Sequence, residues 1–571
     1  DWQPIRAGLE VKFSRYEWEK GYTATFSARD QLVTTIETVE GKVLTLRDAP
    51  PKAVPDAALR HCDDGALQAV IDRAIREKRN VAVPAGYYRL AHGLTVTDAT
   101  GIAIEGASGE NTVLDISEGV GACFSMRNGT EVTIRNFRMV GNTGFAERDQ
   151  AGHFPTWGCR GIWGQDLRTC YGTGVRGTER VLIENVHASR MSLECFWSGG
   201  PSRQGTNEPK QYTKAITYLR CSATDCGRNG FNNNDMAENT SILYCRIVDV
   251  GGCAWEGASR FVKVVGNYVR NAGTVAVGNI HSRDESFEVL PSGQHIIADN
   301  VFESVVPYGG CAIRSASGAT PVVIANNLFV NFGSAAIEVS GTIGPGLPSC
   351  NTTVSGNLFD MTEIGTVSKP RHAIDVSASD TIVSNNQIYV RGATDRNVTA
   401  IRLHEPALNV SVHDNLIRNC GTGLATTRGS SRVSAVVDGA TFLAAWAGVP
   451  MARRRSHLYR DWSLLWTSGS HAGSLAIIEV FDPETYRFKL KEAQGMKVGD
   501  AFDVCPPYGA NWSIHSNTIA GCAQPVLLES YGSESSVFRD NLVSRGEAVG
   551  VAQAVRLAGR FAFSGNLISG F

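Results

Sequence analysis

One short pattern recurs along most of this chain: two or three apolar residues, a polar residue, then Asn or Cys, then an apolar alternation. The strings KVVGNYV, IIADNVF and FSGNLI are three examples. The repeated position is occupied by Asn185, Cys221, Cys245, Asn267, Asn300, Asn327, Asn357, Asn386, Asn415, Asn517, Asn541 and Asn566. Most steps are 22 to 33 residues, with one jump of 102 between Asn415 and Asn517. Such a period indicates a repeat architecture.

Short β-rich alternations with turn residues and no helical periodicity fit a solenoid, in which each coil lies on the previous one at ~4.8 Å. At a sharp corner, the amide of the recurring Asn can satisfy backbone groups and bond its equivalents on the coils above and below. Cys221 and Cys245 occupy the same position, where they could form a disulfide across one coil or stack as buried thiols.

The charge balance argues against a nucleic-acid partner, because 54 Lys and Arg residues nearly match 56 Asp and Glu residues. No run of 18 apolar residues is present, so we expect no membrane span. The chain starts at Asp1 without a basic-then-apolar leader, so a signal was either removed or never present. We expect a secreted or periplasmic protein. The 14 cysteines show no zinc-binding spacing, and Cys159 with Cys170 is the pair favoured for a disulfide.

The first 55 residues lie outside the repeat. Residues 32–51 alternate around Glu40-Gly41, which predicts a hairpin, and residues 474–504 show a similar alternation with a turn at Asp482-Pro483. The two segments predict one small β-module built from both, or two separate ones. The predicted organisation is a hairpin module (1–55), a parallel β-helix with capping helix and cleft insertions (56–429), an inserted β-module (430–510) and C-terminal coils (511–571).

A capping helix is predicted over residues 65–78, because Asp64 is a good N-cap and Leu67, Val70, Ile71 and Ile75 form one apolar stripe. The strand-like VAVPAGYYRL follows at residues 81–90. A helix, this entry strand and then stacked coils resemble the N-terminal part of the pectate-lyase-like, right-handed parallel β-helix superfamily. The recurring Asn and Cys position predicts about a dozen coils, and the resemblance implies an all-β, right-handed parallel β-helix and a carbohydrate-active protein. That superfamily includes glycoside hydrolases, polysaccharide lyases, epimerases, transferases and phage tailspikes.

Long insertions locate the expected working face, since excursions from a solenoid tend to build a cleft on one side. They cover residues 141–178, 198–213, 281–292 and 430–510. The basic run MARRRS (451–456) lies in the last of these and is either a solvated loop or a contact for an anionic substrate.

A second set of short strands follows the corners, and strand alternation should direct one polar side chain outward from each. These outward residues are predicted to be Glu256, Arg314, Glu338, Asp375, Arg402, Glu529 and Arg556. In the C-terminal half, the alternating charges are explained by ordinary cross-strand pairing. In the N-terminal half, acidic, amide, basic and indole side chains converge on successive coils, which suits a sugar.

The predicted catalytic carboxylates are Asp235, Glu256, Asp284 and Glu285. The predicted substrate-binding residues are Trp197, Asn233, Asn234, Trp255, Arg260, His281, Arg283, Arg314 and Glu338. Carboxyls on adjacent coils, such as those of Asp235 and Glu256, could lie ~5 Å apart as in a retaining glycosidase, whereas a partner on the 281–292 loop would allow the ~6.5–9.5 Å of an inverting one. The consecutive Asp-Asp of polygalacturonase-like hydrolases is absent from the central coils.

The favoured function is therefore a glycoside hydrolase acting on an oligo- or polysaccharide, with no cofactor. A uronate-specific polysaccharide lyase or epimerase is the first alternative, with a base and either a cation or calcium to neutralise the uronate carboxyl. A non-catalytic, tailspike-like glycan-binding protein is the second. The oligomeric state is left open.

Overall fold

The computed structural model of this protein describes most of the predicted coils. The described residues are 2–6, 9–12, 34, 36–40, 43–48, 61–142, 170–199, 213–233, 237–257, 259–272, 277–279, 293–303, 312–315, 321–332, 335–340, 351–361, 371–391, 395–404, 407–427, 429–445, 459–482, 485–505, 511–530, 536–545 and 553–571. All statements below concern these ranges.

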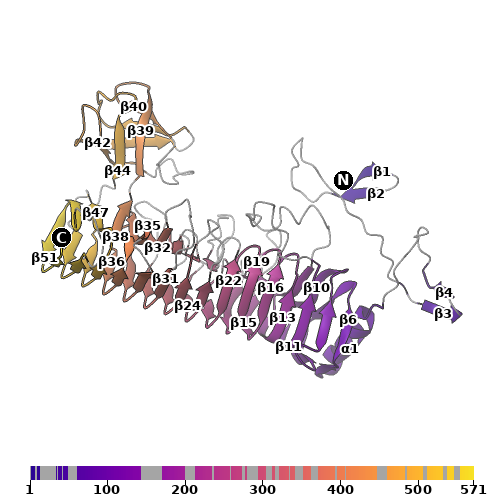
Figure 1. Ribbon diagram of the computed structural model, residues 1–571. Helices are drawn as coiled ribbons and strands as arrows, with labels where there is room; N and C mark the ends of the chain where they lie inside the picture. The colour runs from indigo at the N-terminus through magenta and orange to yellow at the C-terminus, as the bar shows by residue number, and fades with distance from the viewer. Residues whose placement is uncertain are drawn as a thin grey trace.

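One wall of the solenoid is a 14-stranded parallel sheet, here called the long sheet. Its strands follow the chain in order along the axis (Figure 1). They are β7 (His92–Thr97), β10 (Val120–Arg127), β12 (Cys170–Arg176), β14 (Phe196–Gly199), β17 (Phe231–Asn233), β20 (Trp255–Gly257), β23 (Val277–Asn279), β26 (Ile313–Ser315), β29 (Ala335–Val339), β32 (Arg371–Val376), β35 (Asp395–His404), β38 (Cys420–Thr427), β47 (Gln524–Ser530) and β50 (Val555–Gly559). Since β12 is an ordinary strand of this sheet, the predicted insertion 141–178 is too long at its C-terminal end.

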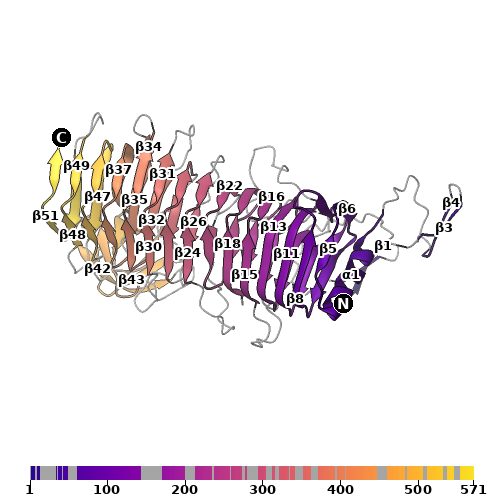
Figure 2. The ribbon, with the colours of Figure 1, turned by 90° about the horizontal axis from the view of Figure 1, so that it is seen from below.

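Two further parallel stacks complete each coil, and they meet at the asparagine corner (Figure 2). The first stack contains β5 (Val81–Val83), β8 (Thr100–Gly106), β11 (Thr130–Val140), β13 (Glu179–Ser189), β15 (Thr213–Leu219), β18 (Ala237–Leu243), β21 (Lys263–Val265), β24 (His295–Ala298), β27 (Val322–Ala325), β30 (Thr352–Ser355), β33 (Thr381–Ser384), β36 (Ser411–His413), β45 (Ser513–His515), β48 (Ser536–Arg539) and β51 (Phe561–Ser564). The second contains β6 (Gly86–Arg89), β9 (Thr112–Asp115), the later halves of β11 and β13, β16 (Ser222–Cys226), β19 (Arg246–Val250), β22 (Tyr268–Ala272), β25 (Val301–Glu303), β28 (Leu328–Val330), β31 (Leu358–Met361), β34 (Gln387–Val390), β37 (Leu416–Arg418), β46 (Thr518–Ala520), β49 (Leu542–Ser544) and β52 (Leu567–Ser569). The fold predicted as a right-handed parallel β-helix is confirmed.

The recurring asparagines form a continuous buried ladder. The Asn267 amide donates to Oδ1 of Asn300 at 2.9 Å, and the same bond repeats on every later coil up to Asn566. The residue before each ladder position has a positive φ, for example 57° at Asp299 and 67° at Gly356. Asn, Asp and Gly adopt this left-handed conformation at the lowest cost, which explains why they dominate this position.

The prediction that Asn185 occupies the repeated position is wrong by one residue. Strand register pairs Glu184 with Leu219 and His187 with Ser222, so Asn185 lies beside Arg220 and Val186 beside Cys221. Asn185 instead donates to Oδ1 of Asn136 at 2.8 Å. Because the motif tolerates a polar residue on either side of the corner, sequence alone did not fix the register here.

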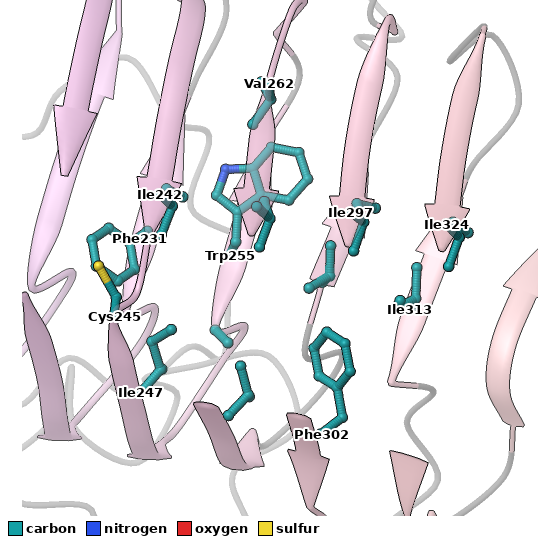
Figure 3. Packing of buried hydrophobic residues seen from close by; sticks show 14 of the residues in the cluster. Phe231, Ile242, Cys245, Ile247, Trp255, Val262, Ile297, Phe302, Ile313 and Ile324 are labelled. Atoms are coloured by element: carbon teal, nitrogen blue, oxygen red, sulfur yellow. The ribbon is translucent and has the colours of Figure 1, made fainter. Parts of the chain in front are cut away.

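The interior is filled by apolar side chains that stack on their equivalents from coil to coil (Figure 3). Phe302, Phe329 and Phe359 stack with ring centroids 5.2 and 4.9 Å apart, close to the spacing of the coils. Figure 3 shows Phe231, Trp255 and Phe302 pointing into this interior. Because each coil buries its apolar residues only against its neighbours, the ends of the solenoid need a cover.

Helix α1 (Asp64–Glu77) supplies that cover at the N-terminal end. It begins one residue earlier than predicted, with Asp63 as N-cap instead of Asp64. Both carboxylates bind the first coil: Asp63 accepts from the Arg89 backbone N–H at 2.8 Å, and Asp64 accepts from that of His92 at 3.0 Å and also from that of Gly65 in the first turn of the helix at 2.8 Å. Ile71 is buried as predicted, but Val70 is 52% exposed, so its inclusion in the apolar stripe was wrong.

The inserted β-module is a small closed barrel of six antiparallel strands. These are β39 (Gly429–Val436), β40 (Thr441–Ala444), β41 (Ser463–Trp466), β42 (Leu475–Asp482), β43 (Arg487–Leu490) and β44 (Ala501–Cys505). It has its own aromatic core, separate from that of the solenoid.

At the N-terminus, β1 (Trp2–Arg6) pairs with β2 (Leu9–Lys12), and β3 (Ile36–Glu40) with β4 (Val43–Leu46), so the two predicted hairpin segments belong to separate structures.

The described cysteines carry free thiols, and all of them except Cys62 are buried. The predicted Cys159–Cys170 disulfide is therefore wrong for Cys170, while Cys159 lies outside the described residues. Cys221 and Cys245 are buried, stacked thiols, one of the two alternatives left open by the sequence.

Nothing helical among the described residues has the length and hydropathy of a bilayer-spanning segment.

Candidate functional site

The predicted row of outward charges exists on the long sheet. Strand register places Glu256, Gly278, Arg314, Glu338, Asp375 and Arg402 at equivalent positions on six consecutive strands. Arg556 continues the row, but its register partner on β47 is Leu527, and Glu529 lies two residues further along. Strand alternation therefore predicted correctly that these side chains lie on the outer face of the long sheet. The predicted place of Glu529 in the row is wrong by two residues.

Two predicted sugar-binding residues lie in the core. Trp255 is 1% exposed, and its indole Nε1 donates to Oδ1 of Asn233 at 2.5 Å. Asn233 is itself fully buried and also bonds Ser198. Their predicted contact with a sugar is inconsistent with this burial. Both flank outward residues of their strands, Glu256 and Asn232, and strand alternation turns them inward.

Three other predicted binding residues are engaged in ion pairs. Arg260 binds Glu238 at 2.7 Å, and Lys214 binds the same carboxylate at 3.2 Å. Partial burial raises the pKa of Glu238, but the hydrogen bonds from Arg260 and Lys214 outweigh it and hold this pKa below its ordinary value. Arg314 and Glu338 pair with each other across adjacent strands at 3.1 Å. These contacts stabilise the coils, which is the ordinary function of cross-strand pairs.

The remaining predicted site residues divide into two groups. Trp197 is partly exposed, lies beside Asn232 in register, and has the Arg176 guanidinium 4.7 Å from the centre of its ring. The others lie outside the described residues: Asn234, Asp235, His281, Arg283, Asp284 and Glu285. Their predicted roles stay predictions.

Glu256 is the predicted catalytic residue around which the structure builds a polar centre. Its Oε2 accepts from Asn229 Nδ2 at 2.6 Å, from Asn232 Nδ2 at 3.2 Å and from Arg228 Nη2 at 3.5 Å. No described residue donates a hydrogen bond to Oε1, and the side chain is 18% exposed. One carboxylate oxygen is thus fixed by three donors, while the other accepts from none of the described residues.

A second carboxylate lies behind this centre. Arg228 Nη1 binds Oε1 of Glu194 at 2.6 Å, so the guanidinium bridges Glu194 and Glu256. Burial raises the pKa of Glu194 above its ordinary value, nearby Arg228 lowers it in part, and the charge of Glu256 raises it again. The Glu194 side chain is 2% exposed, so we assign it a positioning role on Arg228.

The two asparagines complete the centre, and both are buried. Asn229 accepts from the Cys253 backbone N–H at 2.7 Å, which fixes the orientation of its amide toward Glu256. Asn232 donates to Glu256, and its Oδ1 is buried without a hydrogen-bond partner in the described part of the protein. An orphaned buried acceptor is costly, and a donor from a ligand or water would relieve it.

A second polar group lies four strands further along the same row. Asp375 accepts two bonds from Arg402, from Nε at 2.7 Å and from Nη2 at 2.5 Å, and one from His404 Nε2 at 2.8 Å. Burial alone would raise the pKa of Asp375, but the hydrogen bonds from Arg402 and His404 outweigh it and hold the pKa far below its ordinary value. Both oxygens of Asp375 accept hydrogen bonds from the protein, which favours the prediction that charges in this half of the row serve cross-strand pairing.

Sequence reasoning missed Glu194, Arg228 and Asn229. They precede long-sheet strands, where the alternation rule does not apply. A signal was present, because the register of Phe196, Phe231 and Trp255 places Glu194, Asn229 and Cys253 at one equivalent position two residues earlier. Aligning the repeats on these buried aromatic residues would have brought Glu194 and Asn229 together.

The described residues contain no cluster of three or more His, Cys, Asp or Glu side chains suited to a metal ion.

Three stacks of short parallel strands, a capping helix and an asparagine ladder are now established for this chain. Its fold is a right-handed parallel β-helix. No protein-family model and no curated protein matches the sequence.

The solved structures to which this chain is similar are related to it only at low identity. The A-module of the Azotobacter vinelandii mannuronan C-5 epimerase AlgE4 is 14% identical, with a TM-score of 0.30 over 90% of this chain and 94% of that one. A DFA-IIIase from Arthrobacter chlorophenolicus A6 in complex with GF2 is 15% identical, with a TM-score of 0.46 over 63% and 92%. A tailspike protein mutant of E. coli bacteriophage HK620, in complex with a pentasaccharide, is 10% identical, with a TM-score of 0.38 over 80% and 92%. At this similarity, the function must be argued from the chain's own residues.

Proposed function

We propose that this protein is a glycoside hydrolase in which Glu256 is a catalytic carboxylate. The observation that carries the proposal is the convergence of Arg228, Asn229 and Asn232 on one oxygen of Glu256, with the other oxygen free of protein donors in the described structure. A carboxylate that reacts with a glycoside must be held in one orientation while one oxygen faces the substrate. In the cross-strand pair of Arg314 with Glu338, one side chain supplies both donors to a single oxygen, whereas three different side chains converge on Oε2 of Glu256.

Glycoside cleavage needs two carboxyl groups, one ionised and one protonated. Glu256, an acceptor of three N–H donors, takes the ionised role of nucleophile or base. The proton donor is proposed among Asp235, Asp284 and Glu285, which the sequence places on the segments next to the Glu256 coil. Glu194 is excluded from direct contact with substrate by its burial, and it orients Arg228 instead.

The test is a panel of neutral, uronic and host-type glycans treated with wild-type protein and with Glu256→Gln. New reducing ends and the absorbance of an unsaturated product are recorded in parallel. The proposal expects reducing ends without the unsaturated chromophore, and a loss of about three orders of magnitude in kcat for the variant. Glu529→Gln is the matched control, because Glu529 lies on the same face of the long sheet and pairs with Arg556 at 3.7 Å.

The other outcomes distinguish the alternatives. An unsaturated product would establish a lyase, in which Arg228 beside Glu256 would neutralise the uronate carboxyl. A uronate epimerised without cleavage would be detected by NMR of the product. Binding of a glycan without formation of any product would favour the alternative of a tailspike-like glycan-binding protein.

A further inference from the structure

Two arginines lie side by side on the outer face of the long sheet. Arg127 on β10 and Arg176 on β12 are register partners on adjacent strands, and both side chains are exposed. Neither guanidinium forms an ion pair with a described residue. Partial burial and the positive charge of Arg127 lower the pKa of Arg176. Two like charges therefore face each other across adjacent strands.

Other arginines of this face are placed differently. Arg314, Arg402 and Arg556 each bind a carboxylate on the neighbouring strand, at 3.1, 2.5 and 3.7 Å. Opposite charges across a strand pair stabilise a sheet, whereas like charges directly opposite each other destabilise it. An anion bound between Arg127 and Arg176 would remove this repulsion, so the pair is suited to a ligand rather than to the stability of the coils.

An aromatic side chain lies beside the arginine pair. The Arg176 guanidinium is 4.7 Å from the centre of the Trp197 ring, and Trp197 is partly exposed. The register partner of Trp197 on β12 is Gly174, where an added Cβ would lie 3.8 Å from Cε3 of the indole. The ring thus extends over Gly174, on the side of the arginines. An indole in this position offers a stacking surface for a sugar ring next to two cations.

The same face leads from the arginines to the polar centre. Trp197, Asn232 and Glu256 are register partners on β14, β17 and β20. Strand β12, which carries Arg176, is three strands from β20, or about 14 Å at the usual spacing of paired strands. A short oligosaccharide spans this length, so one ligand can contact the arginine pair and Glu256 together.

We propose that Arg127 and Arg176 bind a carboxylate or sulfate group of an acidic oligosaccharide, whose neighbouring sugar stacks on Trp197. Guanidinium groups donate paired N–H bonds to such oxyanions, and a charged acceptor makes these bonds stronger than neutral ones. The inference deepens the proposed function, because it makes the substrate of Glu256 an acidic glycan. Its catalytic consequence rests on that function, whereas binding of the acidic group does not.

Surface plasmon resonance of the immobilised full chain tests the binding, since flowing ligand is replaced even if it is cleaved. Neutral, uronic and sulfated oligosaccharides of equal length are compared. An acidic ligand should bind about tenfold more tightly than a neutral one, and Arg127→Gln and Arg176→Gln should each weaken it about tenfold. Arg556→Gln is the matched control, because it removes one positive charge from the same face and should leave the affinity unchanged.

The pH dependence distinguishes the two acidic groups. Binding of a uronate should weaken below about pH 4 as its carboxyl is protonated, whereas a sulfate ester stays charged. Equal affinity for neutral and acidic ligands, or no binding of any acidic ligand, would overturn the proposal. An equal loss in Arg556→Gln and Arg176→Gln would overturn it as well, because it would show attraction to the general charge of the face.

Steady-state kinetics on a cleaved acidic glycan gives the second measurement. Arg176→Gln should raise KM about tenfold and change kcat only slightly, because the arginine pair is remote from the bond beside Glu256. An unchanged KM would refute its contribution to substrate binding. If instead Glu256→Gln were fully active, the proposed function would fail, while the affinities of the arginine variants would still decide the anion site.

Discussion

The side-chain amide of Asn415 donates to Oδ1 of Asn517 at 2.9 Å, although 102 residues separate the two in sequence. The β36–β45 and β37–β46 pairs have the same separation, so the coil that ends with β38 at Thr427 is followed in the stack by the coil that starts near Ser513. The barrel of β39–β44 is therefore an excursion between two stacked coils, with its own core.

Replacing residues 430–510 by a short Gly/Ser linker should leave the solenoid folded. Loop length alone changes closure entropy slowly, and the asparagine ladder does not involve the barrel. Calorimetry of the deletion variant should show the solenoid transition within a few degrees of its position in the full chain. Loss of that transition would mean that the barrel is part of the cooperative core.

Asn386→Ala should lower the free energy of unfolding by about 4 kcal/mol. Asn386 is fully buried, donates to Val354 O and Asn415 Oδ1 at 3.0 Å, and accepts from Asn357. Urea unfolding measures the change. Asn409→Gly is the control, because Asn409 is exposed and its φ of 55° suits glycine. Equal losses in the free energy of unfolding for both variants would show that the buried hydrogen bonds of the ladder do not stabilise the protein more than exposed ones do.

Glu194→Gln should lower kcat by about a hundredfold with little change in KM, since it displaces Arg228 without touching substrate. Arg228→Lys should behave similarly, because Lys cannot bridge two carboxylates with a planar fork. Steady-state kinetics on a cleaved glycan checks both variants. A loss as large as that of Glu256→Gln would instead give Glu194 a direct catalytic role.

Asp375→Asn should destabilise the protein by about 3 kcal/mol near pH 7, and this loss should shrink progressively as pH falls below about 3.9. The hydrogen bonds from Arg402 and His404 hold the folded-state pKa of Asp375 below its unfolded value. A depressed carboxyl pKa contributes stability that is present above the unfolded pKa, about 3.9, and is lost as pH falls below it. The difference in melting temperature between variant and wild type should be constant from pH 7 to about pH 5 and become smaller between about pH 4 and pH 3. A difference that stays constant down to pH 3 would contradict the ion-pair explanation.

His295→Gln should weaken the acid sensitivity of the protein between pH 6.5 and pH 4. Burial lowers the pKa of His295 to about 4, and its Nε2 bonds Ser259 O at 2.8 Å. In this window the unfolded chain binds more protons than the folded one, so the wild-type free energy of unfolding falls by up to about 3 kcal/mol as pH decreases.

Urea unfolding at four pH values in this window measures the slope for His295→Gln. The exposed residue His61 supplies the control variant His61→Gln, which removes an imidazole from the surface. An unchanged slope in His295→Gln would assign the acid sensitivity to other groups, with His372 as the next candidate because burial lowers its pKa to about 4 as well.

The sequence by itself determined the stacking, the inserted module and the outward row of charges. The ladder asparagines and the apolar alternation repeat with one period, and stacked coils are the arrangement that satisfies both at once. The same alternation already excluded Trp255 from a sugar site once Glu256 was assigned outward, because adjacent residues of a strand point to opposite faces.

Only the tertiary structure decided which polar residues meet. Glu194 and Arg228 lie just before long-sheet strands, where backbone direction changes and no period of two predicts the side-chain direction. Their bridge to Glu256 depends on the register between three coils and on the depth to which each side chain is buried. Neither quantity is encoded in a local pattern, because both arise from contacts between residues that are 24 to 35 positions apart.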